Sequence, residues 1–548
     1  MIEKINLTML TDFYEITMAN GYFEADMKDD IAYFDMFFRK VPDDGGYAIM
    51  AGLEQVIQYM DNLEFTDEDI EYLRGKGIFS EKFLEYLKNF EFTCDVWAVP
   101  EGTPIFPYEP LITVRGPAMQ AQFVETMILL LVNHQSLIAT KASRIVRAAK
   151  GRPIMEFGTR RSHSTTAAIY GARASFIGGC AGTACTIADE NFGTPALGTM
   201  AHSWVQMFDN EYEAFKKYTQ IYPTNATLLV DTYNVLKSGV PAAIKVFKEL
   251  DPPNKGIRID SGDISFLTKK ARAMLDEAGL EDCKIVISNS LDEYIIRDVL
   301  DEGACIDSFG VGERLITSKS EPVFGGVYKL AALETDGKMI PKIKISENVE
   351  KITNPGFKAI WRLFDKDTNR MLADIIALAD EEPPAGDEIE IFDPNATWKK
   401  KTITNFYAKN LRERIFEGGK KVYESPDIKE IKKYCAEQMD LMWDEMKRFE
   451  NPQTYYVDLS DKLWNLKTKM INEAKSNRKE TMHEQNPEAT PGFIMFLIML
   501  CRLNRERSGS CGPQYPLRLD GLASDTDADR SDQDVQPYTY ELWLSLQV

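Results

Sequence analysis

The feature that most constrains the fold is a repeated unit that runs from about residue 153 to residue 315. Each unit has a short run of β-branched or small apolar residues, then a polar or glycine-rich turn, then a helical stretch. The spacing of roughly 20 to 30 residues is typical of one strand and the helix that follows it. The runs are IMEFG, SFIGGC, ALGTM, ATLLVD, GIRID, KIVIS and IDSFGVG. This alternation predicts an α/β fold with a parallel sheet.

Seven consecutive units without a clear dinucleotide-binding fingerprint favour an irregular (β/α) barrel. Polar residues or glycines stand at the ends of the predicted strands, at Arg160, Thr199, Asp231, Asp260, Ser288 and Gly310. In a barrel these ends meet on one face, where active sites form. Ser, Thr and Asp also cap the helices that follow strands, and capping is the simpler interpretation of any single position. For the whole set, a shared site is the better interpretation.

The segments that flank the repeat predict a second, α+β domain built from both chain ends. Residues 1–120 contain two helical patterns, LTDFYEITMANGYF and FTDEDIEYLRGKGI, and the strand-like runs AYFDMFFRKV, DVWAVPEG and PLITVRG. GVYKLAALE and PKIKIS predict strands after about residue 330, so we expect residues 331–486 to complete this domain. A charged helical region over 425–479 closes it.

Residues 121–330 then form the barrel-like domain, which begins with a long amphipathic helix over 125–150 that packs in the core. The last part of the chain, 487–548, is polar and has no periodicity. Such a segment is predicted to be disordered or loosely attached.

The charge balance restricts the partners. Lys and Arg total 64 and Asp and Glu total 85, a net charge of −21 that opposes binding to nucleic acid or to an anionic membrane. A phosphate ligand must therefore meet a local basic pocket. The start MIEKINLTMLTDFYE lacks the marks of a secretory signal, which favours a cytoplasmic protein. The longest apolar run, FIMFLIMLC, is too short to cross a bilayer.

Eight cysteines are spread along the chain, and none forms a CxxC pair. Reduced, mostly buried thiols are expected from this density. Cys180 and Cys185 are close enough in sequence to be weighed as metal ligands, but they stand among Gly and Ala with no histidine nearby. That environment disfavours a metal site.

Two segments carry basic groups at predicted strand ends. EFGTRRSHS (156–164) places two arginines where a forked guanidinium meets phosphate or carboxylate oxygens, although surface arginine pairs are common. LGTMAHSWVQMF (197–208) contains His202, one of four histidines. An imidazole acts as a base, a metal ligand or a phosphate acceptor near pH 7. A histidine among Ala, Met and Trp is usually structural, but its position at a strand end favours function.

Two further segments combine charge with glycine. In GIRIDSGDI (256–264), Arg258 precedes Asp260 and Asp263, which suits a charged substrate, ribose hydroxyls and Mg²⁺. Capping of the next helix is an equal alternative for Asp263. In SFGVGERL (308–315), Gly310 and Gly312 let backbone N–H groups approach a phosphate. Leu315 replaces the third glycine of a dinucleotide fingerprint, which favours a monophosphate cradle.

The ordered set LTDFYE, EFGTRR, GTMAHS, RIDSGD, ISNSLDE, GVGERLITS and GGVYKL resembles the nicotinate phosphoribosyltransferases of the type II phosphoribosyltransferase group. The likeness runs from about Leu7 to at least Leu363. It implies a barrel-like domain joined to a smaller domain from both chain ends, in a head-to-tail homodimer with shared active sites. It also implies a ligase-type reaction of NAD biosynthesis: nicotinate and phosphoribosyl pyrophosphate give nicotinate mononucleotide and pyrophosphate, with coupled ATP hydrolysis and Mg²⁺.

The resemblance also implies residue roles, which are carried over motif by motif. His202 would be phosphorylated by ATP, and Asp260 would act on the ribosyl or Mg²⁺ side. Arg258 would pair with the nicotinate carboxylate, Thr199 would line the same pocket, and Phe157 and Tyr14, the latter from the neighbouring subunit, would sandwich the ring. The remaining substrate-binding positions are Arg160 for the phosphates, Gly310 and Gly312 for the 5′-phosphate, Ser288 and Glu313.

Two departures from the family pattern matter. Nicotinamide-using relatives carry Asp in a GTDT segment, whereas this chain reads GTAC with Ala184 at that position, which favours a carboxylate substrate. Glu313 stands where some members have Thr, so either its carboxylate points away from a phosphate or the phosphate contact is made by the backbone. The alternatives are a nicotinamide or quinolinate phosphoribosyltransferase, or a noncatalytic phosphosugar-binding homologue.

Overall fold

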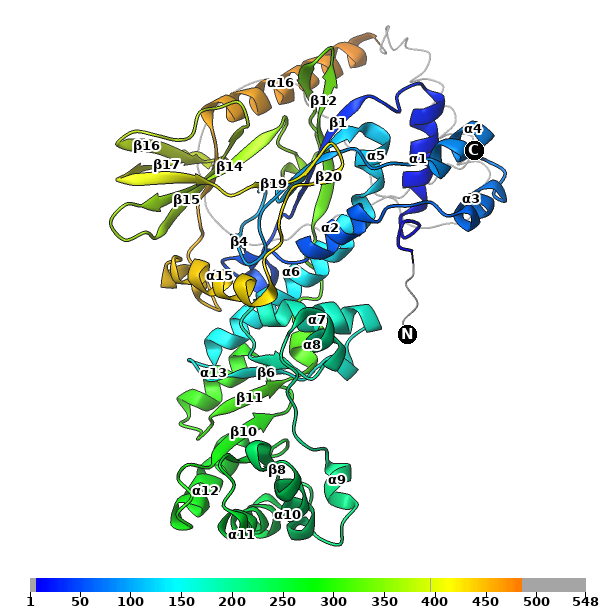
Figure 1. The fold of residues 1–548 in the computed structure, drawn as a ribbon. Helices are drawn as coiled ribbons and strands as arrows, with labels where there is room; N and C mark the ends of the chain where they lie inside the picture. The colour runs from blue at the N-terminus through cyan, green and yellow to red at the C-terminus, as the bar shows by residue number, and fades with distance from the viewer. Residues whose placement is uncertain (1–5, 395, 485–548) are drawn as a thin grey trace, which may run out of the picture. The chain divides into compact units, whose positions relative to one another are not determined.

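The computed structural model describes residues 6–394 and 396–484 (Figure 1). Of the described residues, those as far as Lys475 form one compact unit, and residues 476–484 belong to a separate one. The expected tail over 487–548 lies outside the described residues. The domain boundaries near residues 120 and 330 remain predictions.

A six-stranded parallel sheet forms from the repeated units. Its strand order is β7-β6-β11-β10-β9-β8, with Val286 opposite both Ser308 and Arg258. Its bounds are β6 (Ile154–Glu156), β7 (Gly182–Thr183), β8 (Ala226–Leu229), β9 (Lys255–Ile259), β10 (Lys284–Ser288) and β11 (Ser308–Val311). The runs IMEFG, ATLLVD, GIRID, KIVIS and IDSFGVG therefore contain strands as predicted.

The parallel sheet is an open half-barrel, so the expected barrel needs correction. Within the described residues β7 pairs only with β6 among the strands, and β8 pairs only with β9. SFIGGC begins inside helix α7 (Thr165–Ile177), because the Ala-rich segment before it propagates a helix. ALGTM contributes one isolated bridge, from Ala196 to Thr183, in place of a strand. The expected closing strands are thus a helix end and a loop.

Helices follow the strands and cover the sheet, and their apolar faces close a core with Ile257, Ile287 and Phe309. Asp263 caps α12, where its carboxylate accepts a hydrogen bond from the Phe266 N–H at 2.7 Å, so the capping interpretation holds for this residue. The helices of this region are α8 (Thr186–Phe192), α9 (His202–Gln206), α10 (Glu211–Ile221), α11 (Val240–Leu250), α12 (Ile264–Glu277), α13 (Glu293–Asp301) and α14 (Glu313–Ile316).

A seven-stranded antiparallel sheet draws strands from early and late parts of the chain, in the order β13-β12-β1-β5-β3-β19-β20. Ile31 lies opposite Glu334, and Ala98 lies opposite Glu413. The bounds are β1 (Ile31–Phe37), β3 (Asp95–Ala98), β5 (Ile112–Pro117), β12 (Val327–Thr335), β13 (Lys338–Pro341), β19 (Glu413–Glu417) and β20 (Lys420–Lys421). The expected strand PKIKIS is mostly wrong, since β13 ends at Pro341.

Smaller sheets and helices complete the described chain. The region expected to be one charged helical segment over 425–479 contains a strand between two helices. The strands are β2 (Ala48–Ile49), β4 (Pro104–Ile105), β14 (Lys358–Asp365), β15 (Met371–Leu378), β16 (Glu388–Asp393), β17 (Ala396–Thr404), β18 (Phe406–Asn410) and β21 (Val457–Leu459). The helices are α1 (Phe13–Glu24), α2 (Leu53–Asp61), α3 (Asp67–Arg74), α4 (Glu81–Lys88), α15 (Ile428–Asp440) and α16 (Asp461–Glu484).

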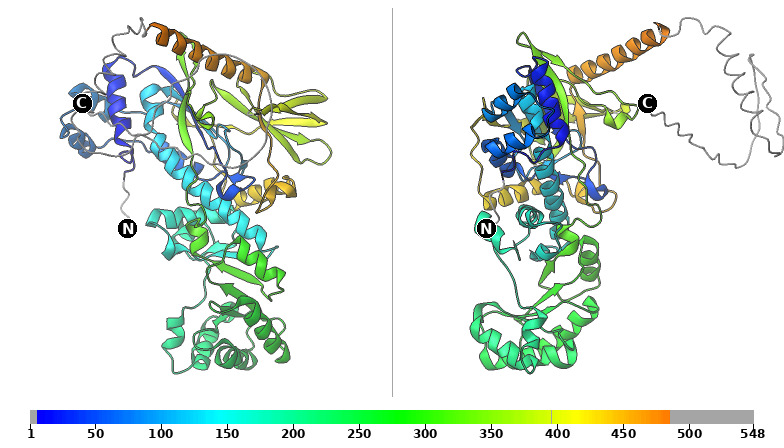
Figure 2. Two further views of the ribbon diagram at one scale, coloured as in Figure 1. Left: turned by 180° about the vertical axis from the view of Figure 1, so that it is seen from behind. Right: turned by 90° about the vertical axis from the view of Figure 1, so that its right-hand side faces the viewer.

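The long helix α6 (Glu125–Ala148) lies between the two large sheets, as Figures 1 and 2 show. Its residues enter three separate hydrophobic cores, for example through Ile128, Ile138 and Ile145. Together with α5 (Ala118–Phe123) it is long and apolar enough to cross a membrane by length and composition, but 72% of the most apolar stretch is buried in the fold. That burial is typical of a core helix.

One buried carboxylate near the start of α6 predicts a pH dependence of stability. Burial raises the pKa of Glu15 from about 4.5 to about 7, although the Thr126 hydroxyl donates a hydrogen bond to it at 2.6 Å. Between about pH 4.5 and pH 7 the folded state therefore keeps a proton on Glu15 that the unfolded chain loses. The free energy of unfolding thus falls as the pH rises through this range. Gln does not titrate, so the free energy of unfolding of Glu15→Gln should increase relative to that of the parent by about 1 kcal/mol when the pH is raised from about 5 to about 8, allowing for solvent screening. Urea unfolding at both pH values measures it, and a constant difference contradicts it.

Candidate active site

Arg258, on β9, is the centre of a polar cluster at the carboxyl end of the parallel sheet. Its Nε donates to Ser288 Oγ at 2.8 Å, Nη1 donates to Thr199 Oγ1 at 3.0 Å, and Nη2 donates to Asp260 Oδ1 at 2.9 Å. The side chain is 17% exposed. Three partners from three segments fix the guanidinium plane, which leaves an oriented cation for an anionic ligand.

Asp260 follows β9 and is held from several sides. The Ser288 hydroxyl donates a short hydrogen bond to the same Oδ1 that Arg258 contacts. The Asp260 N–H donates to Asp231 Oδ2 at 3.0 Å, and the Ser261 hydroxyl donates to the same oxygen at 2.6 Å. Asp231 Oδ1 is buried and has no partner in the described chain. The cluster therefore holds two carboxylates from neighbouring strand ends.

His202 begins α9 and borders this cluster. Its Nδ1 lies 3.2 Å from the Thr232 hydroxyl, and its Nε2 lies 4.0 Å from Asp260 Oδ2. The imidazole is 42% exposed, so a ligand from solvent can reach it. The Thr232 contact fixes the ring so that Nε2 faces the carboxylate.

The aromatic ring of Phe157 forms another wall. The Arg258 guanidinium lies 5.6 Å from its ring centroid, and the Phe157 N–H donates to Val311 O at 2.8 Å. A Cβ atom on Gly310 would come within 2.5 Å of this ring, and one on Gly312 within 3.1 Å of the Phe157 carbonyl oxygen. Glycine at both positions allows β11 to approach the Phe157 loop closely.

Glu156 anchors the Phe157 loop through hydrogen bonds, a role that the sequence motifs did not predict. Its side chain is fully buried, and burial raises the pKa of its carboxyl. The Thr183 hydroxyl donates to Glu156 Oε2 at 2.6 Å, and the Gly158 N–H donates to Oε1. The carboxylate thus links the Phe157 loop to the residue before Ala184. Its place inside EFGTRR was the available signal.

Three of the predicted site residues lie outside the polar cluster. Arg160 is exposed and makes no hydrogen bond or ion pair with any residue that the structure describes. Glu313 forms a 2.8 Å ion pair with Lys319, which turns its carboxylate away and lowers its pKa. Tyr14 lies on α1, where burial and then the Glu125 carboxylate raise the pKa of its phenol. Figures 1 and 2 show α1 near the start of α6 and β10 beyond its other end, so one chain does not bring Tyr14 to Arg258.

Three family models cover most of the chain. The nicotinate phosphoribosyltransferase N-terminal domain matches residues 9–133, the family model itself matches 153–370, and the C-terminal domain matches 357–467. Together they span the half-barrel and the antiparallel sheet.

Known proteins agree with these models. A nicotinate phosphoribosyltransferase of Bacillus subtilis (strain 168) is 44% identical over 88% of this chain and 98% of its own length, and one of Caenorhabditis elegans is 32% identical over 83% and 92%. The crystal structure of human nicotinic acid phosphoribosyltransferase aligns with a TM-score of 0.73 at 27% identity, over 84% of this chain and all of that one. The fold likewise matches a nicotinate-nucleotide pyrophosphorylase from Pyrococcus furiosus, with a TM-score of 0.62 at 24% identity over 80% and 97%. The chain is therefore an enzyme of the nicotinate phosphoribosyltransferase family.

Proposed function

We propose that this enzyme joins nicotinate to phosphoribosyl pyrophosphate, giving nicotinate mononucleotide and pyrophosphate, with ATP hydrolysis coupled to the reaction. The observation that carries the proposal is the guanidinium of Arg258, fixed by Ser288, Thr199 and Asp260 beside the Phe157 ring. A planar cation next to an aromatic face fits a flat ring that bears a carboxylate. Thr199 lines the same pocket.

Ala184 supports the choice of nicotinate over nicotinamide. A carboxylate at this position would repel the substrate carboxylate and accept a hydrogen bond from an amide, whereas a methyl group does neither. The Glu156–Thr183 contact holds the backbone immediately before Ala184 in place. Specificity in this proposal therefore comes from attraction by Arg258 and from the lack of an acid at position 184, while the Asp260 carboxylate is already paired with Arg258.

The pyridine nitrogen is the nucleophile in the transfer. The bond from the anomeric carbon to pyrophosphate breaks as the nitrogen lone pair forms the new bond to that carbon, and positive charge develops on the sugar in the transition state. Arg160 is exposed three positions after Phe157, so its guanidinium can contact the phosphates. Gly310 and Gly312 allow the backbone to approach the 5′-phosphate closely. Groups that bind the departing charge more strongly than the substrate accelerate the reaction.

Mg²⁺ fits the donors at this site. The unpartnered Asp231 Oδ1 and the Asp260 carboxylate are hard oxygen ligands of the kind that this ion prefers. When bound, Mg²⁺ would neutralise the charge that develops on pyrophosphate. Asp231 and Asp260 would hold it.

His202 is the residue proposed to couple ATP to synthesis. Its imidazole attacks the γ-phosphorus of ATP and ADP leaves, which forms a phosphohistidine, and water later cleaves the P–N bond to release phosphate. The contact with Thr232 orients the ring for this attack. A phosphorylated His202 tightens substrate binding and favours product formation.

The active site also needs Tyr14 from a neighbouring copy in this proposal. Tyr14 is 45% exposed on α1, and Figure 1 shows α1 away from β10, whose end supplies Ser288 to the cluster. A head-to-tail homodimer in the cytoplasm, with Tyr14 of one subunit and Phe157 of the other on the two faces of the nicotinate ring, satisfies both observations. Sedimentation of the full chain measures the assembly state.

Incubation with γ-labelled ATP tests the coupling. We expect an acid-labile, base-stable phosphoryl group on the parent protein and none on His202→Ala, because no other histidine lies in the cluster of described residues. The variant keeps the fold, but ATP no longer stimulates mononucleotide synthesis. Equal stimulation of parent and variant by ATP contradicts the role of His202.

The same assay separates the alternatives. A noncatalytic phosphosugar-binding homologue forms no product and acquires no label. A nicotinamide or quinolinate phosphoribosyltransferase forms product from its own substrate when the three pyridines compete at equal concentration. We expect nicotinate mononucleotide to dominate.

A further inference from the structure

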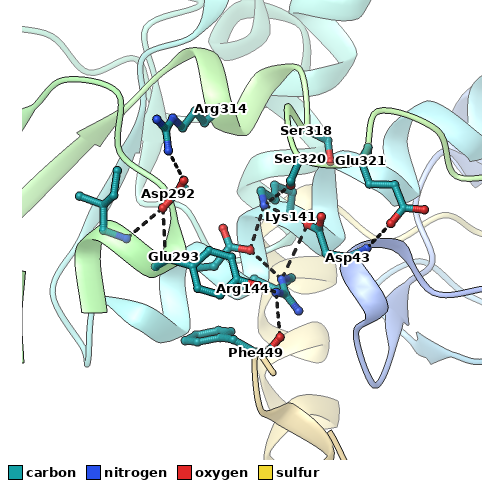
Figure 3. Close-up of polar contacts among 12 residues, drawn as sticks. Asp43, Lys141, Arg144, Asp292, Glu293, Arg314, Ser318, Ser320, Glu321 and Phe449 are labelled. Atoms are coloured by element: carbon teal, nitrogen blue, oxygen red, sulfur yellow. Dashed lines mark hydrogen bonds and ion pairs between the residues drawn. The ribbon is translucent and has the colours of Figure 1, made fainter. Parts of the chain in front are cut away.

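A network of buried charges gathers around Lys141 and Arg144 of α6, with Asp292 and Arg314 close by (Figure 3). We call Asp43, Lys141, Arg144 and Glu293 the ion network. Lys141 Nζ lies 2.9 Å from Asp43 Oδ2 and 2.9 Å from Glu293 Oε1, and it donates to Ser320 Oγ at 2.8 Å. Arg144 Nε donates to the same Glu293 oxygen at 2.8 Å. Three segments that are distant in sequence, at Asp43, Glu293 and Ser320, therefore meet on α6.

Every charge in the ion network is buried and matched. The side chains of Lys141, Arg144 and Glu293 are 3%, 5% and 0% exposed, and that of Asp43 is 9% exposed. Two cations face two anions, so no net charge remains to attract a ligand. A buried, balanced ion network adds little net stability compared with an apolar core of the same shape, because the cost of desolvation offsets the attraction. The network is thus a candidate for positioning.

The segment that it fixes is the loop between β10 and α13. Glu293 is the first residue of α13, and its neighbour Asp292 caps the helix by accepting hydrogen bonds from the Tyr294 and Ile295 N–H groups. Asp292 also forms an ion pair with Arg314 of α14. The α13 start therefore connects α6 to the segment that directly follows Gly312.

This loop has an unusual backbone. Asn289 and Ser290, which directly follow Ser288, have φ values of 122° and 39°. Two consecutive residues other than glycine in this region are strained, and such strain persists only where the surroundings enforce it. Buried Leu291 and the contacts of Asp292 and Glu293 supply that enforcement. Strained backbone of this kind gathers at ligand sites.

We propose that the ion network and the Asp292–Arg314 pair are positioning groups for phosphoribosyl pyrophosphate. They hold the β10–α13 loop and the Gly310–Gly312 segment at the spacing that receives the phosphoribosyl group. The proposal rests on the proposed function, because it takes Ser288, Gly310 and Gly312 as substrate contacts. None of the network residues touches substrate in this arrangement.

Steady-state kinetics of the full chain, with both substrates varied, tests the proposal. In Lys141→Met and Glu293→Gln we expect KM for phosphoribosyl pyrophosphate to rise about tenfold or more, since small displacements of binding groups have effects of this size. KM for nicotinate should change less than about threefold, because the Arg258 contacts stay. This split between the two substrates is the readout that a purely structural role would not produce.

Lys358→Met is the matched control. Lys358 is also a buried lysine, 2% exposed, and its Nζ lies 2.7 Å from Asp35 Oδ2, between β14 and β1. It belongs to no contact of the candidate site. We expect a loss of thermal stability comparable to that of Lys141→Met, with both KM values within about twofold of the parent. Equal kinetic changes in the two lysine variants overturn the proposal.

Asp292→Asn decides the matter if the buried variants do not fold. The Asp292 and Arg314 side chains are 14% and 32% exposed, and Asn is as good a helix cap as Asp, so the variant should fold. It still loses the charge that holds Arg314, and KM for phosphoribosyl pyrophosphate should rise at least about threefold. An unchanged KM overturns the proposal.

Gly312→Ala separates this inference from the function beneath it. If the parent forms no nicotinate mononucleotide, the proposed function fails, and the positioning role fails with it. Suppose that the parent is active, that Gly312→Ala raises KM for phosphoribosyl pyrophosphate and that Asp292→Asn does not. In that case only the positioning role fails.

Discussion

Arg258→Ala should lower kcat/KM for nicotinate by about 30-fold to a few thousandfold, because loss of one partner of a desolvated, hydrogen-bonded charge pair costs 2–5 kcal/mol. The guanidinium is 17% exposed and has three fixed partners, so little of this loss is recovered by movement of nearby groups. Initial rates measured against nicotinate at saturating phosphoribosyl pyrophosphate give the value.

The control for Arg258→Ala is the comparison between its two substrates. KM for phosphoribosyl pyrophosphate should change far less than that for nicotinate, since Arg258 contacts the pyridine carboxylate in the proposed site. Arg258→Lys keeps the charge but loses the fork that Ser288 and Thr199 hold, so we expect an intermediate loss. Equal losses for both substrates in Arg258→Ala count against the assignment.

Arg362→Met should lower the free energy of unfolding by about 3–5 kcal/mol, because it leaves a buried carboxylate without its counter-charge. Arg362 is fully buried on β14, and its Nη2 and Nε lie 2.6 Å and 2.9 Å from the Asp374 oxygens. Glu109 is the more distant carboxyl, 3.8 Å from Arg362 Nη2, and burial and then the Asp374 charge raise its pKa well above its usual range. Urea unfolding measures the loss.

A second substitution tests the cause of that loss. Arg362→Met combined with Asp374→Leu removes both charges and should recover most of the stability, since apolar replacement of a whole buried pair is often neutral. Kinetic constants of the folded single variant should match the parent because neither residue contacts the candidate site. A double variant less stable than the single one would show that the charge imbalance is not the cause.

The sequence predicts strands well where β-branched runs stand between polar turns. KIVIS and GIRID have this pattern and form β10 and β9. SFIGGC fails because its apolar residues continue the Ala-rich stretch of α7, where helix propensity exceeds the strand signal of a short run. Which strands lie at the open edges of the sheet, here β7 and β8, depends on pairing between distant segments. A local sequence pattern does not contain this information.

The candidate site was partly visible in the same way. Strand-end reasoning placed Thr199, Asp260 and Ser288 on one face, and the structure brings these three together around Arg258. It did not find the contact of Thr232 with His202 or the buried anchor Glu156, because neither residue type stands out without its partner 27 or more positions away. Geometry across such separations exists only in the folded chain.

The antiparallel sheet has a consequence for how the protein is made. Ile31 of β1 pairs with Glu334 of β12, so one edge of an early, almost wholly buried strand has no partner until about 300 more residues have left the ribosome. At about 5–20 residues per second, that wait lasts on the order of 15–60 s. An apolar strand edge exposed for so long is prone to pair with other nascent chains. The yield of active protein in cells should therefore depend on chaperones that cover this strand until β12 emerges.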